Sequence, residues 1–383
     1  MRIGTLRRSV VTALAVAVAA GSLAPAFAHH KAKHPKPKPK PKTAREIVEY
    51  GPTCVGDPNA VQRLEMTVKG TPTWGLIAMP AKPPKGVVVF GHGYGHTAES
   101  WRRHIARTAA RHQVVAVAMN YRFQQDFPGS PLPSSRGWRV AEGAEDSIAV
   151  AQLVDRACPT AKTFVMYGIS MGFNTAGLAV AAQAKRKNGA PLFDYLFDIE
   201  GAANVTETYF EARALALTGN AYARNAVADI EQEMGGTFEE RRDVYLERTV
   251  VNRAEDIAAS GIKGVVMVHG VADGLVGYNQ APEMYTALRR YGVPVDFWTA
   301  GTRGSKSEAG TTLDGYATGQ IPGYQSPFAG HASEASETHI VGMAGFERLA
   351  ALFSGTAPAC RIGVLDGNAG FTQTAPLTLP ATC

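Results

Sequence analysis

The sequence predicts an α/β protein whose mostly parallel sheet is flanked by helices. The first observation is a set of six short apolar runs that alternate with helix-length stretches along the 383 residues. Continuous apolar strands that alternate with helices are typical of parallel sheets buried on both faces. The second observation is a sharp strand-to-helix turn in the middle of the chain, Gly168-Ile-Ser-Met-Gly172. The expected parallel strands are 86–91, 114–119, 163–167, 192–199, 264–268 and 293–299.

The first 28 residues predict a secretory signal peptide. Arg2, Arg7 and Arg8 precede an apolar run over residues 10–20, and Ala26-Phe-Ala28 forms a small-x-small cleavage site. The apolar run is too short to span a bilayer, and no later stretch reaches about eighteen apolar residues. We therefore expect a secreted protein without a transmembrane helix.

Residues 29–45 alternate lysine with proline and are expected to form an extended, solvated spacer. Residues 1–45 contain ten basic side chains and no acid, so the net charge of +6 becomes −4 for the rest of the chain. The spacer serves either as a plain solubilising segment or as a weak contact to an anionic cell surface, which would make the protein cell-wall associated. Nucleic-acid binding by the acidic body is not expected.

The folded body is predicted to be one domain over residues 46–383. An antiparallel hairpin is expected from runs 61–68 and 74–79, which alternate apolar and polar residues. Helices are expected at 140–157, after the strand-to-helix turn at 174–187, and at 340–353. A charged, helix-rich insertion over 203–261 interrupts the alternation of strands and helices, and residues 355–383 form a C-terminal extension.

The four cysteines, Cys54, Cys158, Cys360 and Cys383, suggest two disulfides in a chain that is expected to enter an oxidising compartment. Three pairings are possible, and free buried thiols are the alternative. We favour Cys54 with Cys158, and Cys360 with Cys383, which would tie the C-terminal extension to the body. No Cys-x-x-Cys or His-Glu-x-x-His spacing occurs, so no metal site is expected.

Ser170 lies at the centre of the strand-to-helix turn and is the candidate nucleophile. A serine at the tip of such a turn has a strained backbone, and its neighbours two residues away must lack side chains. Gly168 and Gly172 meet that requirement. The pentapeptide occurs often by chance, and the flanking apolar strand and Ala-rich helix are what support this interpretation.

A serine hydroxyl is a poor nucleophile at neutral pH, so it needs a histidine base and a carboxylate that orients the base. Asp273 comes directly after a buried strand and is the favoured acid, whereas Glu200, one strand earlier, is the alternative. For the base, His331 lies in a Gly-His loop and His339 lies at the start of the last predicted helix.

The segment Gly91-His-Gly-Tyr-Gly95 follows the first apolar strand, and together with the serine turn it resembles the α/β-hydrolase superfamily. The resemblance covers about residues 61–355. It implies that the backbone N–H groups of Tyr94 and Met171 form the oxyanion hole. It also favours His331 over His339, because the family places a Gly-His loop after its final strand. The chain order Ser170, Asp273, histidine is the order expected for this fold.

The resemblance further implies that the insertion at 203–261 is either a lid or a simple helical decoration. We expect a secreted serine hydrolase, a monomer without a cofactor, that cleaves carboxylic esters through an acyl-enzyme. One alternative is a serine peptidase of the prolyl-oligopeptidase type, which is less favoured because only the spacer precedes the domain. The other is a non-catalytic binding protein of the same fold on the cell surface, against which the complete triad argues.

Overall fold

The computed structural model describes residues 54–123, 137–271, 273–300, 331–334, 339–366 and 370–374. The signal peptide, the Lys/Pro spacer and the pairing of Cys360 with Cys383 lie outside the described residues, as do residues 301–330. The predicted disulfide between Cys54 and Cys158 is present, with Cα atoms 5.6 Å apart. It joins the start of the described body to the end of a helix that packs on the sheet.

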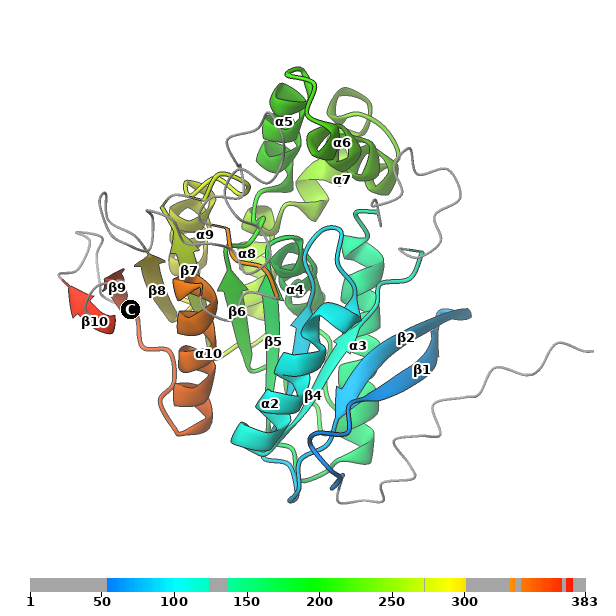
Figure 1. Ribbon diagram of the computed structural model, residues 1–383, viewed down its shortest axis with the longest axis vertical. Coiled ribbons are helices and arrows are strands. Elements are labelled where there is room, and N and C mark those ends of the chain that lie inside the picture. Colours follow the sequence, from blue (N-terminus) through cyan, green and yellow to red (C-terminus); the bar gives the residue numbers. More distant parts are fainter. Residues whose placement is uncertain are drawn as a thin grey trace, which may run out of the picture. The chain divides into compact units, whose positions relative to one another are not determined.

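Among these residues, one mixed sheet of ten strands has the order β1-β2-β4-β3-β5-β6-β7-β8-β9-β10 (Figure 1). The pairs from β4 through β9 are all parallel, and β1, β2 and β10 add antiparallel pairs at the two edges. The predicted mostly parallel sheet is thus confirmed. The strands are β1 (Gln62–Val68), β2 (Thr71–Ala78), β3 (Gly86–Gly91), β4 (Val114–Met119), β5 (Thr163–Ile169), β6 (Tyr195–Ile199), β7 (Gly264–Gly270), β8 (Val295–Ala300), β9 (Ile362–Asp366) and β10 (Gly370–Thr374).

The predicted hairpin is also present as β1 and β2, but its turn is shorter than the segment between the two expected runs, because β2 begins at Thr71 and not at residue 74. Lys69 and Gly70 form a two-residue turn with φ of 48° and 80°, and Val68 pairs directly with Thr71. Two consecutive residues with positive φ produce the backbone twist that two-residue hairpins favour. Every second side chain of β1 is buried, as the alternating sequence predicts.

Helices cover both faces of the sheet (Figure 1). One face is packed by η1 (Ala98–Trp101), α2 (Arg102–His112) and α10 (Ile340–Phe353), and the opposite face by α3 (Val140–Ala157), α4 (Met171–Ala181), α8 (Ala254–Ala259) and α9 (Gln280–Arg290). On the first face the rings of Phe90 and Trp101 stack with centroids 4.6 Å apart. Burying each such large apolar side chain contributes about 1.5–3 kcal/mol.

Helix α4 begins three residues earlier and ends six residues earlier than the sequence predicts. Ser170 is the residue that caps the helix, so Met171 is already its first residue. It ends at Ala181, and Gln183, with a φ of 55°, then turns the chain out of the helical path. At the other end of the molecule, β9 continues the sheet beyond residue 355, where the sequence predicts only an extension.

The insertion contributes three helices beyond the carboxyl ends of the strands: α5 (Val205–Ala216), α6 (Ala221–Met234) and α7 (Phe238–Arg248) (Figure 1). We call these three helices the cap. The remainder of the insertion, η2 (Val250–Arg253) and α8, packs against α4 and belongs to the scaffold. A small apolar core joins the cap to the sheet edge through Tyr209, Ile230 and Tyr245, among others.

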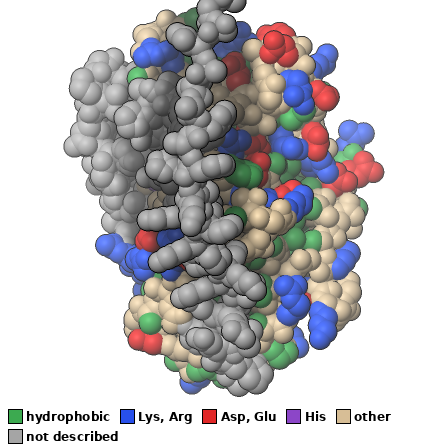
Figure 2. Space-filling model, turned by 90° about the vertical axis from the view of Figure 1, so that its right-hand side faces the viewer, with side chains coloured by type: hydrophobic (Ala, Val, Ile, Leu, Met, Phe, Trp, Pro, Cys, Tyr) green, Lys and Arg blue, Asp and Glu red, His purple; other side chains and the backbone are tan. Residues whose placement is uncertain are grey.

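Within the described part of the chain, no helix is both long and apolar enough to cross a membrane. On the face shown in Figure 2, the acidic and basic side chains that are described are interspersed and form no large patch of one sign. This distribution agrees with the nearly balanced charge of the body.

Candidate active site

Ser170 occupies the turn between β5 and α4 and has φ of 55° and ψ of −129°. This backbone conformation is strained for a residue with a side chain, at a cost of about 1–3 kcal/mol. A Cβ on Gly168 would lie 2.4 Å from the carbonyl oxygen of Gly172, and one on Gly172 would lie 2.2 Å from that of Gly91. Both positions therefore require glycine, as the sequence predicts for a nucleophile turn.

The neighbouring strand holds this turn in place. The Ser170 N–H donates to the Ile199 carbonyl at 3.0 Å, and the Ser170 carbonyl accepts from the Ala202 N–H at 3.2 Å. The serine is only 9% exposed, and its side chain faces the cavity described below. The backbone of β6 thus supports the strained conformation.

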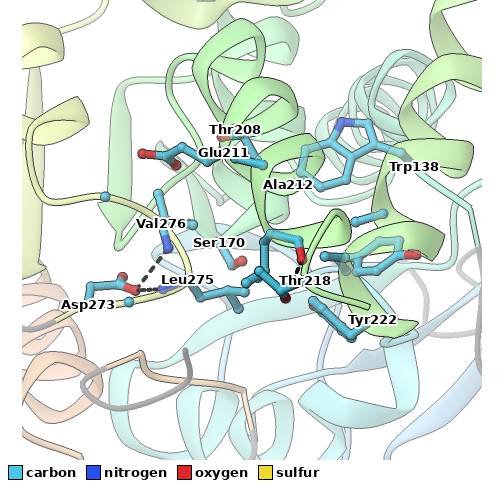
Figure 3. Close-up of a pocket in the computed structure, with 17 residues that line it drawn as sticks. Trp138, Ser170, Thr208, Glu211, Ala212, Thr218, Tyr222, Asp273, Leu275 and Val276 are labelled. Atoms are coloured by element: carbon cyan, nitrogen blue, oxygen red, sulfur yellow. Dashed lines mark hydrogen bonds between the residues drawn. The ribbon is translucent and has the colours of Figure 1, made fainter. Parts of the chain in front are cut away.

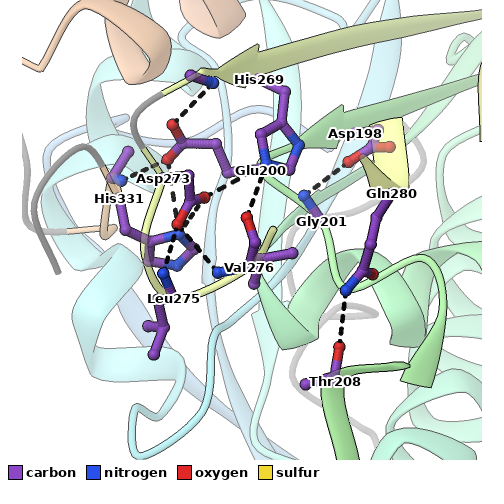
Figure 4. Close-up of polar contacts among 12 residues, drawn as sticks. Asp198, Glu200, Gly201, Thr208, His269, Asp273, Leu275, Val276, Gln280 and His331 are labelled. Carbon is purple, nitrogen blue, oxygen red and sulfur yellow. Dashed lines mark hydrogen bonds and ion pairs between the residues drawn. The ribbon is translucent and has the colours of Figure 1, made fainter. Parts of the chain in front are cut away.

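Asp273 and His331 lie in contact at the carboxyl edge of the sheet (Figure 4). His331 Nδ1 lies 2.7 Å from Asp273 Oδ2, and the N–H groups of Leu275 and Val276 donate to Asp273 Oδ1 at 2.8 and 2.9 Å. Burial alone would raise the pKa of Asp273, but the charge of His331 and the hydrogen bonds outweigh it and hold this pKa far below its usual value. Asp273 is therefore a carboxylate that orients His331.

The structure does not bring all three predicted residues into hydrogen-bond contact. Among the contacts of the described residues, none joins the Ser170 hydroxyl to His331. Catalytic hydrogen bonds are often long without substrate and tighten in the Michaelis complex.

Glu200, the alternative acid, lies beside the pair but has other partners. Its two carboxyl oxygens accept the N–H groups of Gly270, at 3.2 Å, and of Ala332. Its Oε2 is 3.8 Å from His331 Nδ1, which is longer than a hydrogen bond. Burial and the neighbouring Asp273 charge raise the pKa of Glu200 well above its usual value. Through the Ala332 N–H, Glu200 braces the loop that carries His331.

His339, the alternative base, lies at the N-terminus of α10. Its Nδ1 accepts the N–H of Val341 at 3.3 Å, and the side chain is 2% exposed. This is a helix-capping contact, in which a side-chain acceptor satisfies one of the N–H groups that the first turn leaves open. His339 does not contact Asp273, so the geometry favours His331 as the base.

His269 is a residue of this cluster to which the sequence analysis assigns no role. Its Nε2 is 3.0 Å from the Val276 carbonyl and 3.4 Å from Asp273 Oδ2. Burial opposes ionisation of this imidazole, but the hydrogen bond and charge of Asp273 outweigh burial and raise the pKa of His269. His269 lies near the end of strand β7, and Asp273 follows it by four residues. This spacing is the only sequence signal for the contact.

The loop after β3 places Tyr94 and its neighbours beside the serine turn. A turn joins Gly93 to His96, whose N–H donates to the Gly93 carbonyl at 3.2 Å, and Gly95 takes the positive φ of 78° that the turn needs. Met171 occupies the first turn of α4, where an N–H has no acceptor within its own helix. These positions are compatible with the predicted oxyanion hole.

His92 has a structural environment. Its ring stacks on Tyr121 with centroids 4.0 Å apart, and the Tyr121 hydroxyl donates to the His92 carbonyl at 3.2 Å. Burial raises the pKa of this tyrosine well above its usual value, so its hydroxyl stays a hydrogen-bond donor.

A cavity of about 560 Å³ lies between the sheet edge and the cap, with Ser170 and Asp273 in its wall (Figure 3). Most of its lining is apolar. The lining residues are Tyr94, Trp138, Ser170, Thr208, Glu211, Ala212, Ala214, Leu215, Thr218, Tyr222, Ala223, Ala226, Asp273, Gly274, Leu275, Val276 and Gly277. No lysine or arginine occurs among these described residues, and Glu211 is the one carboxyl besides Asp273. Burial, together with the charges of Glu207 and Asp273, raises the pKa of Glu211 to about 7.

One group of side chains within the described ranges has the geometry to hold a cation: Glu200, Asp273 and His331, whose ligand atoms lie within 4.8 Å of one another. His331 Nδ1 is already engaged with Asp273, and both oxygens of Glu200 accept backbone N–H groups. The raised pKa of Glu200 also opposes the deprotonated state that a metal ligand requires. The donor set fits a hydrogen-bonded acid–base pair better than a metal centre.

No protein-family model matches the sequence, and no curated protein matches it either. Solved structures match at low identity. An acylaminoacyl peptidase from Pyrococcus horikoshii is 15% identical over 79% of this chain and 43% of its own, with a TM-score of 0.48. A puromycin-hydrolyzing peptidase from Mycobacterium tuberculosis is 16% identical over 78% and 40%, with a TM-score of 0.49. An esterase from Pyrobaculum calidifontis is 17% identical over 67% and 79%, with a TM-score of 0.46.

The chain spans 36% and 43% of the length of the first two matched peptidase structures. The topology of the chain itself identifies its fold. A parallel sheet covered by helices on both faces carries a serine on a strained strand-to-helix turn, followed along the chain by an aspartate after a later strand and a histidine in contact with that aspartate. The protein has the α/β-hydrolase fold.

Proposed function

We propose that the protein is a serine hydrolase that cleaves carboxylic esters through an acyl-enzyme, with Ser170 as nucleophile, His331 as base and Asp273 as the orienting acid. The observation that carries this proposal is the 2.7 Å contact between His331 Nδ1 and the ionised Asp273, at the sheet edge that also presents the strained Ser170. This combination matches the parts that activate a serine hydroxyl.

In the first half of the reaction, His331 Nε2 takes the proton of the Ser170 hydroxyl as its oxygen attacks the ester carbonyl. The N–H groups of Tyr94 and Met171 would stabilise the resulting oxyanion. When the tetrahedral intermediate collapses, the C–O bond to the alcohol breaks and the imidazolium returns its proton to the leaving oxygen. Asp273 remains ionised throughout because its pKa is far below its usual value.

In the second half, a water molecule replaces the alcohol. His331 accepts a proton from this water, which attacks the acyl carbonyl, and the second tetrahedral intermediate expels the Ser170 oxygen. The imidazolium then protonates Ser170, so acid, alcohol and free enzyme are the products.

The cavity supports an ester with an apolar acyl or alcohol group. Its walls are formed mainly by aromatic and aliphatic side chains, and no described lining residue is a lysine or arginine that would pair with an anionic substrate. The carboxyls of Asp273 and Glu211 would instead repel a substrate carboxylate when they are ionised. Neutral esters therefore fit this cavity better than anionic ones.

A matched pair of substrates tests the reaction class. We would measure kcat/KM for a p-nitrophenyl ester and a p-nitroanilide that carry the same aliphatic acyl group, with Ser170→Ala as the control. We expect faster cleavage of the ester, and no cleavage of either substrate by the variant. Preferential cleavage of amides, above all after an aminoacyl-proline, would reassign the protein to the serine peptidases. A folded wild type that cleaves neither would favour a binding role.

We further propose that the protein is exported and that its Lys/Pro spacer contacts an anionic cell surface. The signal-like N-terminus supports export, and so does the disulfide, because such bonds persist in oxidising compartments. Cell fractionation of the full chain and of a variant that lacks residues 29–43 tests both ideas. Unchanged retention of the variant in the cell wall would exclude the surface contact, and a protein found only inside the cell would exclude export.

A further inference from the structure

Glu334 connects the loop that carries His331 to the loop that carries the predicted oxyanion donor. Its side chain lies in the loop of His331, three residues further along the chain, and is 2% exposed. One carboxyl oxygen accepts the N–H of Gly93, and the other contacts Nδ1 of His96. Gly93 and His96 are the two ends of the turn that contains Tyr94. Glu334 therefore holds both ends of this turn.

The same carboxyl is close to the nucleophile. A Cβ on Gly93 would lie 3.2 Å from Glu334 Oε1 and 3.4 Å from Ser170 Cβ. Gly93 is thus next to both residues, and its lack of a side chain allows this close approach. A displacement of this loop would change the distance between the oxyanion donors and the attacking oxygen.

The Glu334 carboxyl is ionised in this environment. Burial opposes ionisation, but the charge and hydrogen bond of His96, together with the Gly93 N–H, outweigh burial and lower the pKa of Glu334. The negative charge is thereby balanced next to the place where the oxyanion would form. An unbalanced carboxylate at this point would repel the oxyanion.

A second contact holds Tyr94 from the opposite side. Its hydroxyl donates to Asp229 Oδ2 of the cap helix α6 at 2.5 Å, so the side chain is tied to the cap while Glu334 holds the backbone on either side. The direction of the Tyr94 N–H depends on both contacts.

We propose that Glu334 is a positioning residue that, with His96, fixes the turn from Gly93 to His96 so that the Tyr94 N–H points at the developing oxyanion. This inference rests on the proposed function. Because the oxyanion exists only in the transition state and the intermediates, loss of the contact lowers kcat and leaves KM nearly unchanged. A purely structural contact would lower stability and would not change kcat per folded molecule.

The test compares Glu334→Ala with Glu334→Gln on the p-nitrophenyl ester. Glutamine keeps one oxygen for the Gly93 N–H and one amide for His96, whereas alanine keeps neither. We expect kcat per folded molecule, with folding measured by circular dichroism, to fall roughly 100-fold in Glu334→Ala, since a 1 Å misplacement or a lost oxyanion donor has effects of about this size. KM should change less than about threefold, and Glu334→Gln should recover most of kcat.

Asp194→Asn is the matched control, because Asp194 is also a buried carboxyl that is paired with basic side chains, Arg186 and Lys263, but lies at the opposite end of β6 from Ser170. It should lower the thermal midpoint without lowering kcat per folded molecule. If Glu334→Ala behaves like this control, or if KM rises while kcat holds, the positioning role is wrong although the hydrolase remains. If the wild type cleaves no ester, the proposed function fails, and the positioning role fails with it.

Discussion

The sheet edge and the cap both line the cavity, but they are built in different ways. At the sheet edge, Ser170, Asp273 and His331 are each less than 10% exposed, and backbone hydrogen bonds fix the turns that carry Ser170 and Asp273. In the cap, the Phe210 side chain is 41% exposed, and Leu217, the residue directly after cap helix α5, is 90% exposed. The cap presents mainly side chains of Ala, Leu and Tyr to the cavity.

This difference separates two tasks. Groups that react must be held in place within a fraction of an ångström, which buried strands and tight turns provide. Groups that select a substrate need only shape an apolar wall, which surface helices can supply and vary. Substitutions at the sheet edge are therefore expected to change the rate of reaction, and substitutions in the cap its substrate range.

The largest expected effect comes from the base. His331→Ala should lower kcat by roughly 10⁴-fold or more, because the other imidazole in contact with Asp273, that of His269, is buried with its Nε2 against the Val276 carbonyl and does not line the cavity. His339→Ala should leave kcat within about tenfold and mainly destabilise the protein, by about 1 kcal/mol for a lost helix cap. Steady-state kinetics and thermal melts of both variants measure this contrast. If His339→Ala abolished activity and His331→Ala did not, His339 would be the base.

The next effect comes from the acid. Asp273→Asn should lower kcat by about 10³–10⁴-fold, because the amide cannot stabilise the imidazolium and favours the wrong tautomer. Glu200→Gln keeps one acceptor oxygen for the two backbone N–H groups and should lower kcat far less, since Glu200 lies beyond hydrogen-bond distance of the His331 imidazole. Both variants are compared on the same ester. A larger loss in Glu200→Gln would make Glu200 the orienting acid.

In the cap, Leu215 and Leu217 offer a matched comparison. Leu215 lines the cavity, whereas Leu217 lies just beyond helix α5 and does not. Leu215→Trp fills part of the cavity that a long acyl chain would occupy. The kcat/KM for an octanoyl ester should therefore fall about tenfold or more relative to that for an acetyl ester. Leu217→Trp should leave the ratio of the two esters unchanged. Equal profiles for both variants would mean that the acyl chain does not bind beneath the cap.

The smallest expected effect is on stability. Burial raises the pKa of Asp198 to about 7 and that of Glu200 well above its usual value, so the folded state holds protons that the unfolded chain releases above about pH 4. Stability is therefore lost as pH rises through 7. The raised pKa of His269 acts in the same direction, because the folded state binds its proton more tightly than the unfolded chain does.

The thermal midpoint should consequently be lower at pH 8 than at pH 5.5, by roughly 2–4 °C for each kcal/mol of stability lost. Asp198→Asn keeps an oxygen for the Gly201 N–H and should reduce this pH dependence. Differential scanning calorimetry of both proteins in matched buffers makes the measurement. A midpoint that rises between pH 5.5 and pH 8 would contradict the charge states assigned to the sheet edge.

The sequence predicts the features that local patterns encode. The apolar runs mark the parallel strands, and Gly168 and Gly172 mark the turn at Ser170, because in each case the residues of one short segment determine the structure. The position after a buried strand favours Asp273, and the Gly-His loop of the resembling family favours His331; the structure brings these two residues together. Their catalytic roles remain proposals.

Contacts between distant segments leave no such pattern. The Glu334 contact spans 241 residues to Gly93, and Glu334 lies in a short loop segment without secondary structure of its own. The division of the insertion into a cap and the scaffold helix α8 depends likewise on which surface each helix meets. The sequence does not reveal strand β9, because only its pairing with β8 and β10 makes it part of the sheet.

The most direct test of the account is labelling of the purified protein with a fluorophosphonate, followed by mass spectrometry of the peptide that carries the label. A strained, activated serine at the sheet edge predicts one label per molecule, on Ser170, and none on Ser170→Ala. A label on another residue, or a folded wild type that takes up none, would contradict the assignment of Ser170 as the nucleophile.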